Sequence, residues 1–323
     1  GYEITTLRRD VETDGRHAVV AFTDDWQEDA ARRDFTMNAL YADAEGNLYD
    51  YFGGADDAKA GRVKFIGDAK ARIREDVLRI LRFFRFFAHF GKGEADSSAL
   101  AACRELAPLI PNLSVERIAR EFFKLCEAEN PALALRLMNE SNVSAQFLPE
   151  TPDLPRLQTL LDTEKKFGER QGALVRLAAL LPPDESAAYA LAQRLKLSNH
   201  DAETLCALAG LPKVLRANFS PAGIRALIYR YGADHCRSAA FMNGGRISEA
   251  LTLIASWKVP VFPIKGEDIK KLGVSEGPQI GEILQAVEKW WVAGDFKPTR
   301  SACLKQAHIY IDPHNPEKLK TGK

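Results

Sequence analysis

Residues 73 to 87 constrain the fold more than any other stretch and read Ile-Arg-Glu-Asp-Val-Leu-Arg-Ile-Leu-Arg-Phe-Phe-Arg-Phe-Phe. At roughly 100° per residue, apolar side chains fall on one side of a helix and charged side chains on the other. The apolar side holds Ile73, Val77, Ile80, Phe84 and Phe87, and the charged side holds Glu75, Arg79 and Arg82, with Arg72 and Asp76 at its edge. The pattern predicts one helix that buries a single face.

The charged side has a plain structural interpretation and a functional one. In the plain interpretation, Asp76 and Glu75 each form a solvated ion pair with Arg79, which contributes a few tenths of a kcal/mol at most. Such helix faces are common in soluble proteins. The functional interpretation depends on the sequence blocks that surround this helix.

Several blocks flank the helix in a fixed order. They are Arg-Arg-Asp-Phe-Thr-Met-Asn-Ala-Leu at 32 to 40, Leu-Tyr-Asp-Tyr-Phe-Gly-Gly at 48 to 54, Phe-Ile-Gly-Asp at 65 to 68, Ser-Val-Glu-Arg-Ile at 114 to 118 and Glu-Phe-Phe-Lys at 121 to 124. In this order and spacing, the chain resembles the bacterial-type (class II) tRNA nucleotidyltransferase (CCA-adding enzyme) and poly(A) polymerase family. The resemblance is strong over residues 1 to 125. It continues to about 296, through Pro-Val-Phe-Pro at 260 to 263 and Gly-Pro-Gln-Ile-Gly at 277 to 281.

One family feature has no match in the chain. The resemblance implies an Asp-x-Asp pair that binds Mg²⁺ upstream of residue 1, so no metal ligand is assigned in this chain and the chain alone is expected to be inactive. Glu3 lies on a strand that in this superfamily can carry a third catalytic carboxylate. An ordinary position on the surface of a sheet remains the alternative for Glu3.

The secondary-structure pattern is mixed at the amino end and helical afterwards. Alternating residues predict strands at 2 to 8 and 17 to 23, with a turn at Asp14-Gly15, a helix at about 27 to 33, and a hairpin of 38 to 42 with 47 to 51. From residue 55 onward, helices are predicted at about 69 to 90, 97 to 107, 114 to 128 and 131 to 140, in pairs through 151 to 256, and at 264 to 274 and 281 to 294. A polar tail follows residue 313.

These elements predict an α+β fold. The resemblance implies part of a polymerase beta-like nucleotidyltransferase head sheet followed by a mainly helical neck, body and tail. We expect the carboxyl-side part of the head at 1 to 54, a neck that recognises the base at 55 to 128, an RNA-binding body at 129 to 215 and a tRNA-binding tail at 216 to 323.

Composition limits the class of protein. The 323 residues carry 44 basic and 44 acidic side chains, so the overall charge gives no indication of nucleic-acid binding. Residues 61 to 92 nevertheless hold nine Lys or Arg against three acids, which indicates a local phosphate-facing patch. The five cysteines show no metal-binding or disulfide spacing, and no apolar run is long enough for a membrane span. We therefore expect a cytoplasmic protein with reduced thiols; nothing in the sequence indicates an oligomeric state.

The resemblance assigns residues to the incoming nucleotide. It implies that Asp34 lies near the ribose hydroxyls, that Arg33 lies near phosphate, and that Asn38 adds an amide contact. A carboxylate that accepts hydrogen bonds from a sugar diol would favour ribonucleotides. Arg72 and Arg74, on the basic stretch, are predicted to contact RNA phosphates.

Base choice follows from hydrogen-bond chemistry. Adenine and cytosine each present an amino donor beside a ring-nitrogen acceptor, whereas guanine and uracil present the reverse order. A carboxylate only accepts and a guanidinium only donates, so Asp76 and Arg79, spaced i,i+3, form an edge that suits ATP and CTP. The resemblance implies the same role, with Glu75 orienting Arg79. Arg82 is placed to reach phosphate or to support this network.

The resulting hypothesis is template-independent addition of CCA to tRNA 3′ ends from CTP and ATP, with Mg²⁺ as the metal. Two alternatives stay open at this point. One is a poly(A) polymerase or A-adding relative, which would share every block quoted above. The other is a catalytically silent RNA-binding fragment, because the metal-binding pair is absent from the chain.

Overall fold

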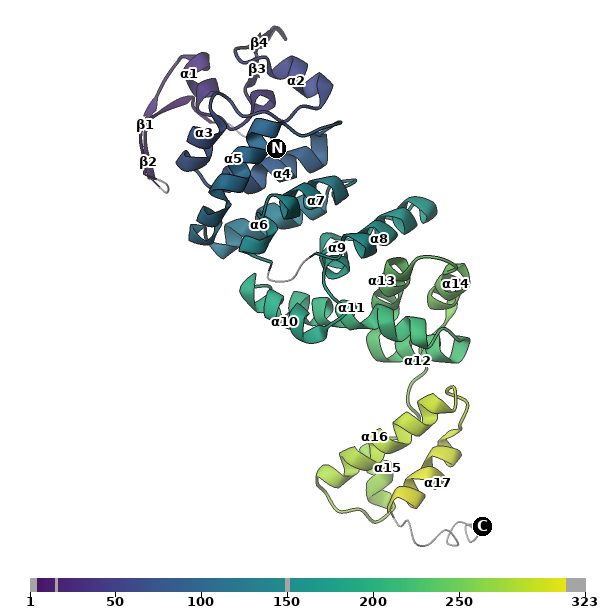
Figure 1. The fold of residues 1–323 in the computed structure, drawn as a ribbon. Helices are drawn as coiled ribbons and strands as arrows, with labels where there is room; N and C mark the ends of the chain where they lie inside the picture. Colours follow the sequence, from purple (N-terminus) through teal and green to yellow (C-terminus); the bar gives the residue numbers. More distant parts are fainter. Residues whose placement is uncertain (1–4, 15–16, 149–151, 312–323) are drawn as a thin grey trace. The chain divides into compact units, whose positions relative to one another are not determined.

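The structure is a computed structural model that describes residues 5–14, 17–148 and 152–311. Two short antiparallel hairpins begin the described part (Figure 1): β1 (Arg8–Asp14) pairs with β2 (His17–Phe22), and β3 (Leu40–Ala42) pairs with β4 (Leu48–Asp50). The second hairpin was predicted within two residues at each end. The strand predicted at 2 to 8 lies outside the described residues over 2 to 4 and is wrong over 5 to 7, because β1 begins at Arg8. Just before β1, the Leu7 carbonyl still accepts a hydrogen bond from the Thr23 N–H at 3.2 Å.

A short helix and a 3₁₀ turn connect the two hairpins. α1 (Trp26–Ala31) begins at Asp25, whose carboxylate accepts hydrogen bonds from the N–H groups of Gln27 and Glu28 and so satisfies two of the unpaired amides of the first turn. The 3₁₀ turn η1 (Thr36–Asn38) follows. The helix predicted at 27 to 33 is therefore confirmed, with an end two residues earlier.

The segment before η1 is fixed to the following helices by aromatic packing. Phe35 is completely buried, and its ring lies 5.0 Å from that of Phe65 and 5.1 Å from that of Phe86. An isolated antiparallel bridge joins Phe35 to Phe65 along the backbone. Gly54 permits close approach on the other side, because a Cβ there would lie 2.1 Å from the carbonyl oxygen of Thr36. This packing holds residues 32 to 38 against the helices.

Six helices follow in the described residues between 54 and 140. They are α2 (Gly54–Ala60), α3 (Ala69–Glu75), α4 (Leu78–Phe90), α5 (Ser97–Leu106), α6 (Val115–Cys126) and α7 (Ala132–Glu140). The amphipathic prediction for the buried face is confirmed at four positions, since Ile73, Ile80, Phe84 and Phe87 are at most 5% exposed. Hydrophobic burial of this face packs α4 against α6 and α7.

The prediction of one helix through residues 73 to 87 is wrong. α3 ends at Glu75 and α4 begins at Leu78, because Asp76 is extended, with φ −148° and ψ 105°. The Asp76 carboxylate accepts a hydrogen bond from the N–H of Leu78 at 3.1 Å. A short polar side chain that can satisfy a free amide competes with the helix at this point, and helical periodicity alone does not reveal that competition.

Four helices come next, and a buried arginine of the second one contacts the first one and the end of α6. They are α8 (Leu154–Phe167), α9 (Ala173–Leu180), α10 (Glu185–Arg194) and α11 (Asn199–Ala217). Arg176 of α9 is 1% exposed and pairs with Glu164 of α8 at 2.6 Å. It also donates to the carbonyl oxygens of Cys126 and Ala128 at 2.7 and 2.5 Å. The guanidinium therefore satisfies carbonyls that the end of α6 leaves without a partner.

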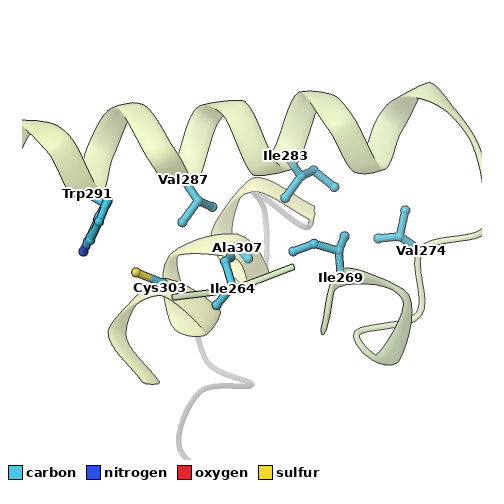
Figure 2. Close-up of a cluster of buried hydrophobic side chains, with 8 residues drawn as sticks. All are labelled: Ile264, Ile269, Val274, Ile283, Val287, Trp291, Cys303 and Ala307. Carbon is cyan, nitrogen blue, oxygen red and sulfur yellow. The ribbon is translucent and has the colours of Figure 1, made fainter. Parts of the chain in front are cut away.

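The last helices are α12 (Pro221–Tyr231), α13 (Ala233–Asn243), α14 (Ser248–Ser256), α15 (Gly266–Lys271), α16 (Pro278–Ala293) and α17 (Arg300–Ile311). α12 begins with a capped first turn: the Ser220 hydroxyl accepts a hydrogen bond from the N–H of Gly223, and Pro221 occupies the first turn. Figure 2 shows Ile283, Val287 and Trp291 of α16 facing the cluster that includes Cys303 and Ala307 of α17.

The chain divides into two compact units. One contains residues 1–210 with 241–244, and the other contains 211–240 with 245–323. The finer four-part division at 54, 128 and 215 stays a prediction. All five cysteines are free, and four of them are buried. Among the described residues, no helix combines the length and the apolar character that crossing a bilayer requires.

Candidate functional site

One pocket of about 700 Å³ lies in the first unit, where the segment around η1 meets α3, α4 and α6. This volume is typical of ligand sites. Its lining residues are Thr5, Arg8, Arg32, Arg33, Asp34, Asn38, Asp76, Leu78, Arg79, Arg82, Phe86 and Arg117. Residues from four separate parts of the sequence thus meet at a single cavity.

The pocket collects most of the residues predicted to contact a nucleotide. Six of the seven line it, namely Arg33, Asp34, Asn38, Asp76, Arg79 and Arg82. The seventh, Glu75, is bonded to Arg79 behind the lining. Glu3, predicted as a third carboxylate, lies outside the described residues.

The electrostatic character of the lining is strongly positive. Six guanidinium groups face two carboxylates, a formal excess of four positive charges. Two further carboxylates, Asp29 and Glu75, pair with lining arginines from behind and reduce the local excess to two. A concave surface with this excess attracts polyanions.

Asp34 connects the η1 segment to α4. Its carboxylate accepts from the Arg82 Nε at 2.6 Å, from the Asn38 amide at 2.9 Å and from the Phe35 N–H at 3.0 Å. The residue is only 6% exposed. These contacts fix the orientation of the carboxylate at the pocket wall and commit Arg82 to it.

Arg79 is held by three contacts. Its Nη1 donates to Glu75 at 2.6 Å and to the carbonyl oxygen of Arg72 at 2.9 Å, and its Nη2 donates to the carbonyl oxygen of Arg32 at 2.8 Å. A guanidinium has five N–H donors, so two remain beyond these contacts. The prediction that Glu75 orients Arg79 agrees with this geometry.

Asp76 is paired differently from the sequence-based expectation. Its carboxylate accepts from Nη2 of Arg117 on α6 at 2.9 and 3.0 Å, rather than pairing with Arg79. Asp76 lies at the break between α3 and α4, so the i,i+3 geometry on one helix is wrong. Both side chains nevertheless line the same pocket, one as an acceptor and the other as a donor.

The two arginines predicted to bind RNA differ in their surroundings. Arg72 donates to the carbonyl oxygen of Ala31 at 2.9 Å and pairs with Glu75 at 2.6 Å. Arg74 has a side chain that is 60% exposed, with Glu105 3.9 Å away. The structure therefore directs Arg72 inward and leaves Arg74 at the surface.

Sequence reasoning missed several lining residues. Arg32 and Arg117 lie inside the sequence blocks that resemble the family, but their spacing assigns them no role, and no pattern distinguishes Arg8 and Phe86. The spacing of Asp29 three and four residues before Arg32 and Arg33 was a usable signal, since it places the carboxylate within reach of both guanidinium groups.

The described residues contain no group of three or more His, Cys, Asp or Glu side chains arranged to hold a metal ion. Asp34 and Asp76, the carboxylates of the lining, are each engaged by an arginine. The donor set present in this part of the chain does not fit a divalent-metal site, so no step of the chemistry below is assigned to a metal held here.

Two family models match the chain. The model described as the poly A polymerase head domain matches residues 1–64, and the model described as the probable RNA and SrmB-binding site of polymerase A matches residues 96–154. The second range covers α5 to α7, and therefore includes Arg117 at the pocket.

Curated relatives match almost the whole chain. The mitochondrial CCA tRNA nucleotidyltransferase 1 of Mus musculus is 33% identical over 312 residues, which cover 94% of this chain and 71% of the relative. The CCA-adding enzyme of Geobacillus sp. is 31% identical over 318 residues, which cover 91% of this chain and 75% of the relative.

Solved structures match the fold. The Bacillus stearothermophilus CCA-adding enzyme in complex with CTP superposes with a TM-score of 0.66 at 24% identity, covering 90% of this chain and 74% of that one. The Thermotoga maritima CCA-adding enzyme complexed with tRNA superposes with a TM-score of 0.60 at 21% identity, covering 89% and 74%.

Proposed function

The chain belongs to the CCA tRNA nucleotidyltransferase family, and from this premise we propose that its pocket selects CTP and ATP for template-independent addition of CCA to the 3′ end of tRNA. The observation that carries the proposal is the pocket itself, which brings the block at residues 32 to 38 together with the junction of α3 and α4. The base, the sugar and the phosphates of a nucleoside triphosphate each have suitable hydrogen-bonding or charged partners among the lining residues.

The base is recognised by Asp76 and Arg79. Asp76 offers only acceptors and Arg79 only donors, so together they complement the pairing edge of cytosine or adenine. Guanine or uracil would leave polar groups without partners, which costs about 1–3 kcal/mol for each buried group. The contacts that hold Arg79 and Asp76 support this role, because a discriminating edge needs fixed side chains.

The sugar and phosphates have their own partners in this proposal. Asp34 accepts from the ribose hydroxyls, with Asn38 beside it, and favours ribonucleotides. The remaining arginines of the lining neutralise the triphosphate, with Arg33 as the predicted phosphate contact. Phosphoryl transfer of this class uses Mg²⁺ to stabilise developing charge.

We further propose that tRNA lies along surfaces outside the pocket and that the protein acts in the cytoplasm. Support for an RNA-binding surface comes from the exposed side chain of Arg74 and from the RNA-binding family model over residues 96–154. Support for a reducing compartment comes from five cysteines that are all free in the structure.

The experiment is incorporation of each labelled triphosphate, separately and together, into tRNA that lacks its last three nucleotides, with Mg²⁺ present. We expect CTP to be added first, ATP only after CTP, and no addition of GTP or UTP. A long tail from ATP alone would replace the proposal by poly(A) polymerase activity. Binding of tRNA without any incorporation would identify a silent RNA-binding protein.

A further inference from the structure

The carboxylate of Asp29 on α1 holds the side chains of two lining arginines, Arg32 and Arg33, and the backbone N–H of a third, Arg8. Asp29 is only 1% exposed and is not part of the lining. Its Oδ1 accepts from the Arg8 N–H at 3.0 Å and from the Arg32 Nε at 2.8 Å. Its Oδ2 accepts from Nε and Nη2 of Arg33 at 3.2 and 3.0 Å.

Tyr41 of β3 completes this arrangement. Its hydroxyl donates to Oδ2 of Asp29 at 2.5 Å and accepts from the Arg33 Nε at 3.0 Å. The Arg33 guanidinium also lies over the Tyr41 ring, 5.2 Å from its centre. Arg33 is thus held from two sides, by a carboxylate and by a phenol.

A buried carboxylate with this many donors is not available for chemistry. Both oxygens are engaged, and protein atoms separate Asp29 from solvent, so it has no room for a metal ion, a substrate or a transferable proton. Burial alone would raise the pKa of Asp29, but hydrogen bonds from Tyr41, the Arg8 N–H, Arg32 and Arg33 outweigh burial and hold that pKa well below its usual value. Asp29 therefore stays charged at neutral pH.

Loss of the Asp29 charge would disturb the arginines that line the pocket. Arginine side chains carry about 2 kcal/mol of rotamer entropy, and six guanidinium groups around one cavity repel one another unless nearby carboxylates offset their charge. With Asp29 neutral, Arg32 and Arg33 lose their shared counter-charge and the start of β1 at Arg8 loses its tie to α1.

We infer that Asp29, assisted by Tyr41, is a positioning residue that preorganises the side chains of Arg32 and Arg33, and fixes the backbone at Arg8, to receive the triphosphate of the nucleotide. The inference rests on the proposed function in one respect, that the ligand carries phosphates. Preorganised donors bind a polyanion better than mobile ones, because little side-chain entropy is lost on binding. Asp29 should therefore affect affinity for phosphates without affecting the choice of base.

The experiment compares equilibrium affinities for ATP, AMP, CTP and GTP in wild type, Asp29→Asn and Tyr41→Phe. For the wild type we expect ATP to bind much more tightly than AMP, since AMP lacks two of the three phosphates. In Asp29→Asn the ratio of ATP to AMP affinity should fall about tenfold or more, and the preference for ATP and CTP over GTP should stay at its wild-type value. Tyr41→Phe should lower the first ratio by a smaller factor.

Asp57→Asn is the matched control. Asp57 is also a buried carboxylate of this region, accepts from the Thr36 hydroxyl at 2.7 Å and pairs with Arg62, but it contacts none of the pocket arginines. Its ratio of ATP to AMP affinity should equal that of the wild type even if its melting temperature falls.

The outcomes separate the two proposals. A wild type without affinity for any nucleotide overturns both the function and the inference. A wild type that favours ATP over AMP, with Asp29→Asn and Tyr41→Phe unchanged in that ratio, overturns the inference alone. If Asp29→Asn does not fold, Tyr41→Phe decides, because it removes one partner of Arg33 and leaves the carboxylate in place.

Discussion

At the scale of single residues, Asp76 performs two structural tasks beside its proposed contact with the base. Its carboxylate accepts from the N–H of Leu78, which begins α4, and from Arg117, which belongs to α6. One side chain therefore links the start of one helix to another helix and to the pocket. A substitution that keeps the shape of the Asp76 side chain but removes its charge separates these structural contacts from the proposed recognition of the base.

We expect Asp76→Asn to reduce discrimination against GTP and UTP. Asparagine keeps one acceptor for Leu78 but also presents an amide donor, so the edge no longer rejects bases that offer an acceptor at that position. The ratio of specificity constants for CTP over UTP should fall about tenfold or more, in line with roughly 1–3 kcal/mol for an unpaired buried group. Steady-state kinetics with all four triphosphates measure it.

Asp68→Asn is the control for Asp76→Asn. Asp68 caps α3 by accepting from the Ala71 N–H at 2.8 Å and lies outside the pocket. Its specificity ratios should equal those of the wild type. If Asp76→Asn folds and keeps the wild-type ratios, Asp76 is only a structural link between α4 and α6.

Part of the site was readable from the sequence at this scale. Asp34, Asp76 and Arg79 lie in short blocks whose residue types suit nucleotide chemistry, and the fold brings all of them to the pocket. The partner of Asp76 was not readable, because Arg117 is 41 residues away and local spacing favours Arg79. Pairings between distant elements depend on tertiary packing, which a single sequence does not encode in its local periods.

At the scale of elements, α3 carries one arginine that supports the pocket and another that lies at the protein surface. Arg72 ties the helix to the carbonyl of Ala31 at the end of α1, whereas the side chain of Arg74 is exposed. Two arginines separated by one residue on a short helix thus have opposite surroundings.

Arg74→Gln and Arg72→Gln should therefore have different effects. If Arg74 contacts a phosphate of tRNA, its loss should reduce the slope of log affinity against log salt concentration by about 0.7–0.9, with an unchanged melting temperature. Arg72→Gln should instead lower the free energy of unfolding by about 1–3 kcal/mol, because the carbonyl of Ala31 loses its side-chain donor and Glu75 loses one of its two arginine partners. Salt titrations of tRNA binding and melting curves test both; equal behaviour of the two variants contradicts the assignment.

The break between α3 and α4 makes a second prediction at this scale. Val77 has φ −58°, Asp76 before it is extended, and among the described residues the Val77 N–H has no backbone acceptor. These are the conditions that proline requires. Val77→Pro should leave the free energy of unfolding within about 1 kcal/mol of the wild type, and a modest gain is expected from a less flexible unfolded chain.

Ala88→Pro, in the last turn of α4, provides the contrast. There proline removes a helical hydrogen bond and collides with the preceding turn, so we expect a loss of about 3 kcal/mol or more. Chemical denaturation of both variants measures the difference. Equal losses would mean that α3 and α4 behave as one continuous helix in solution.

Apolar periodicity in the sequence predicted most helices. It failed where the apolar pattern is weak and where a polar side chain competes with the helix for a backbone N–H. It located α6 and α7 within two residues at each end, because each has a continuous apolar face. It did not predict α17, whose buried side chains, Cys303 and Ala307, are small and give a weak apolar pattern. Periodicity also does not reveal the helix break at Asp76, because apolar residues keep recurring at helical spacing on both sides of the break.

At the scale of the whole molecule, one buried ion pair of the first unit, Arg176 with Glu164, joins α8 to α9 and lies against the end of α6. We expect Arg176→Met to lower the free energy of unfolding by about 3–5 kcal/mol, because Glu164 is left charged and buried. The double variant Arg176→Met with Glu164→Met should recover part of that loss, since it removes the isolated charge. Denaturation curves of wild type, both single variants and the double variant measure the coupling; simple additivity contradicts it.

Arg176 also sets an order of events during synthesis. The carbonyl of Cys126 that it satisfies lies 50 residues earlier in the chain. At ribosomal rates of about 5–20 residues per second, that distance corresponds to a delay on the order of several seconds. During this interval the last turn of α6 has only water as a partner for that carbonyl. The end of α6 therefore reaches its final hydrogen bonding only after translation of Arg176, a residue that does not yet exist when α6 is made.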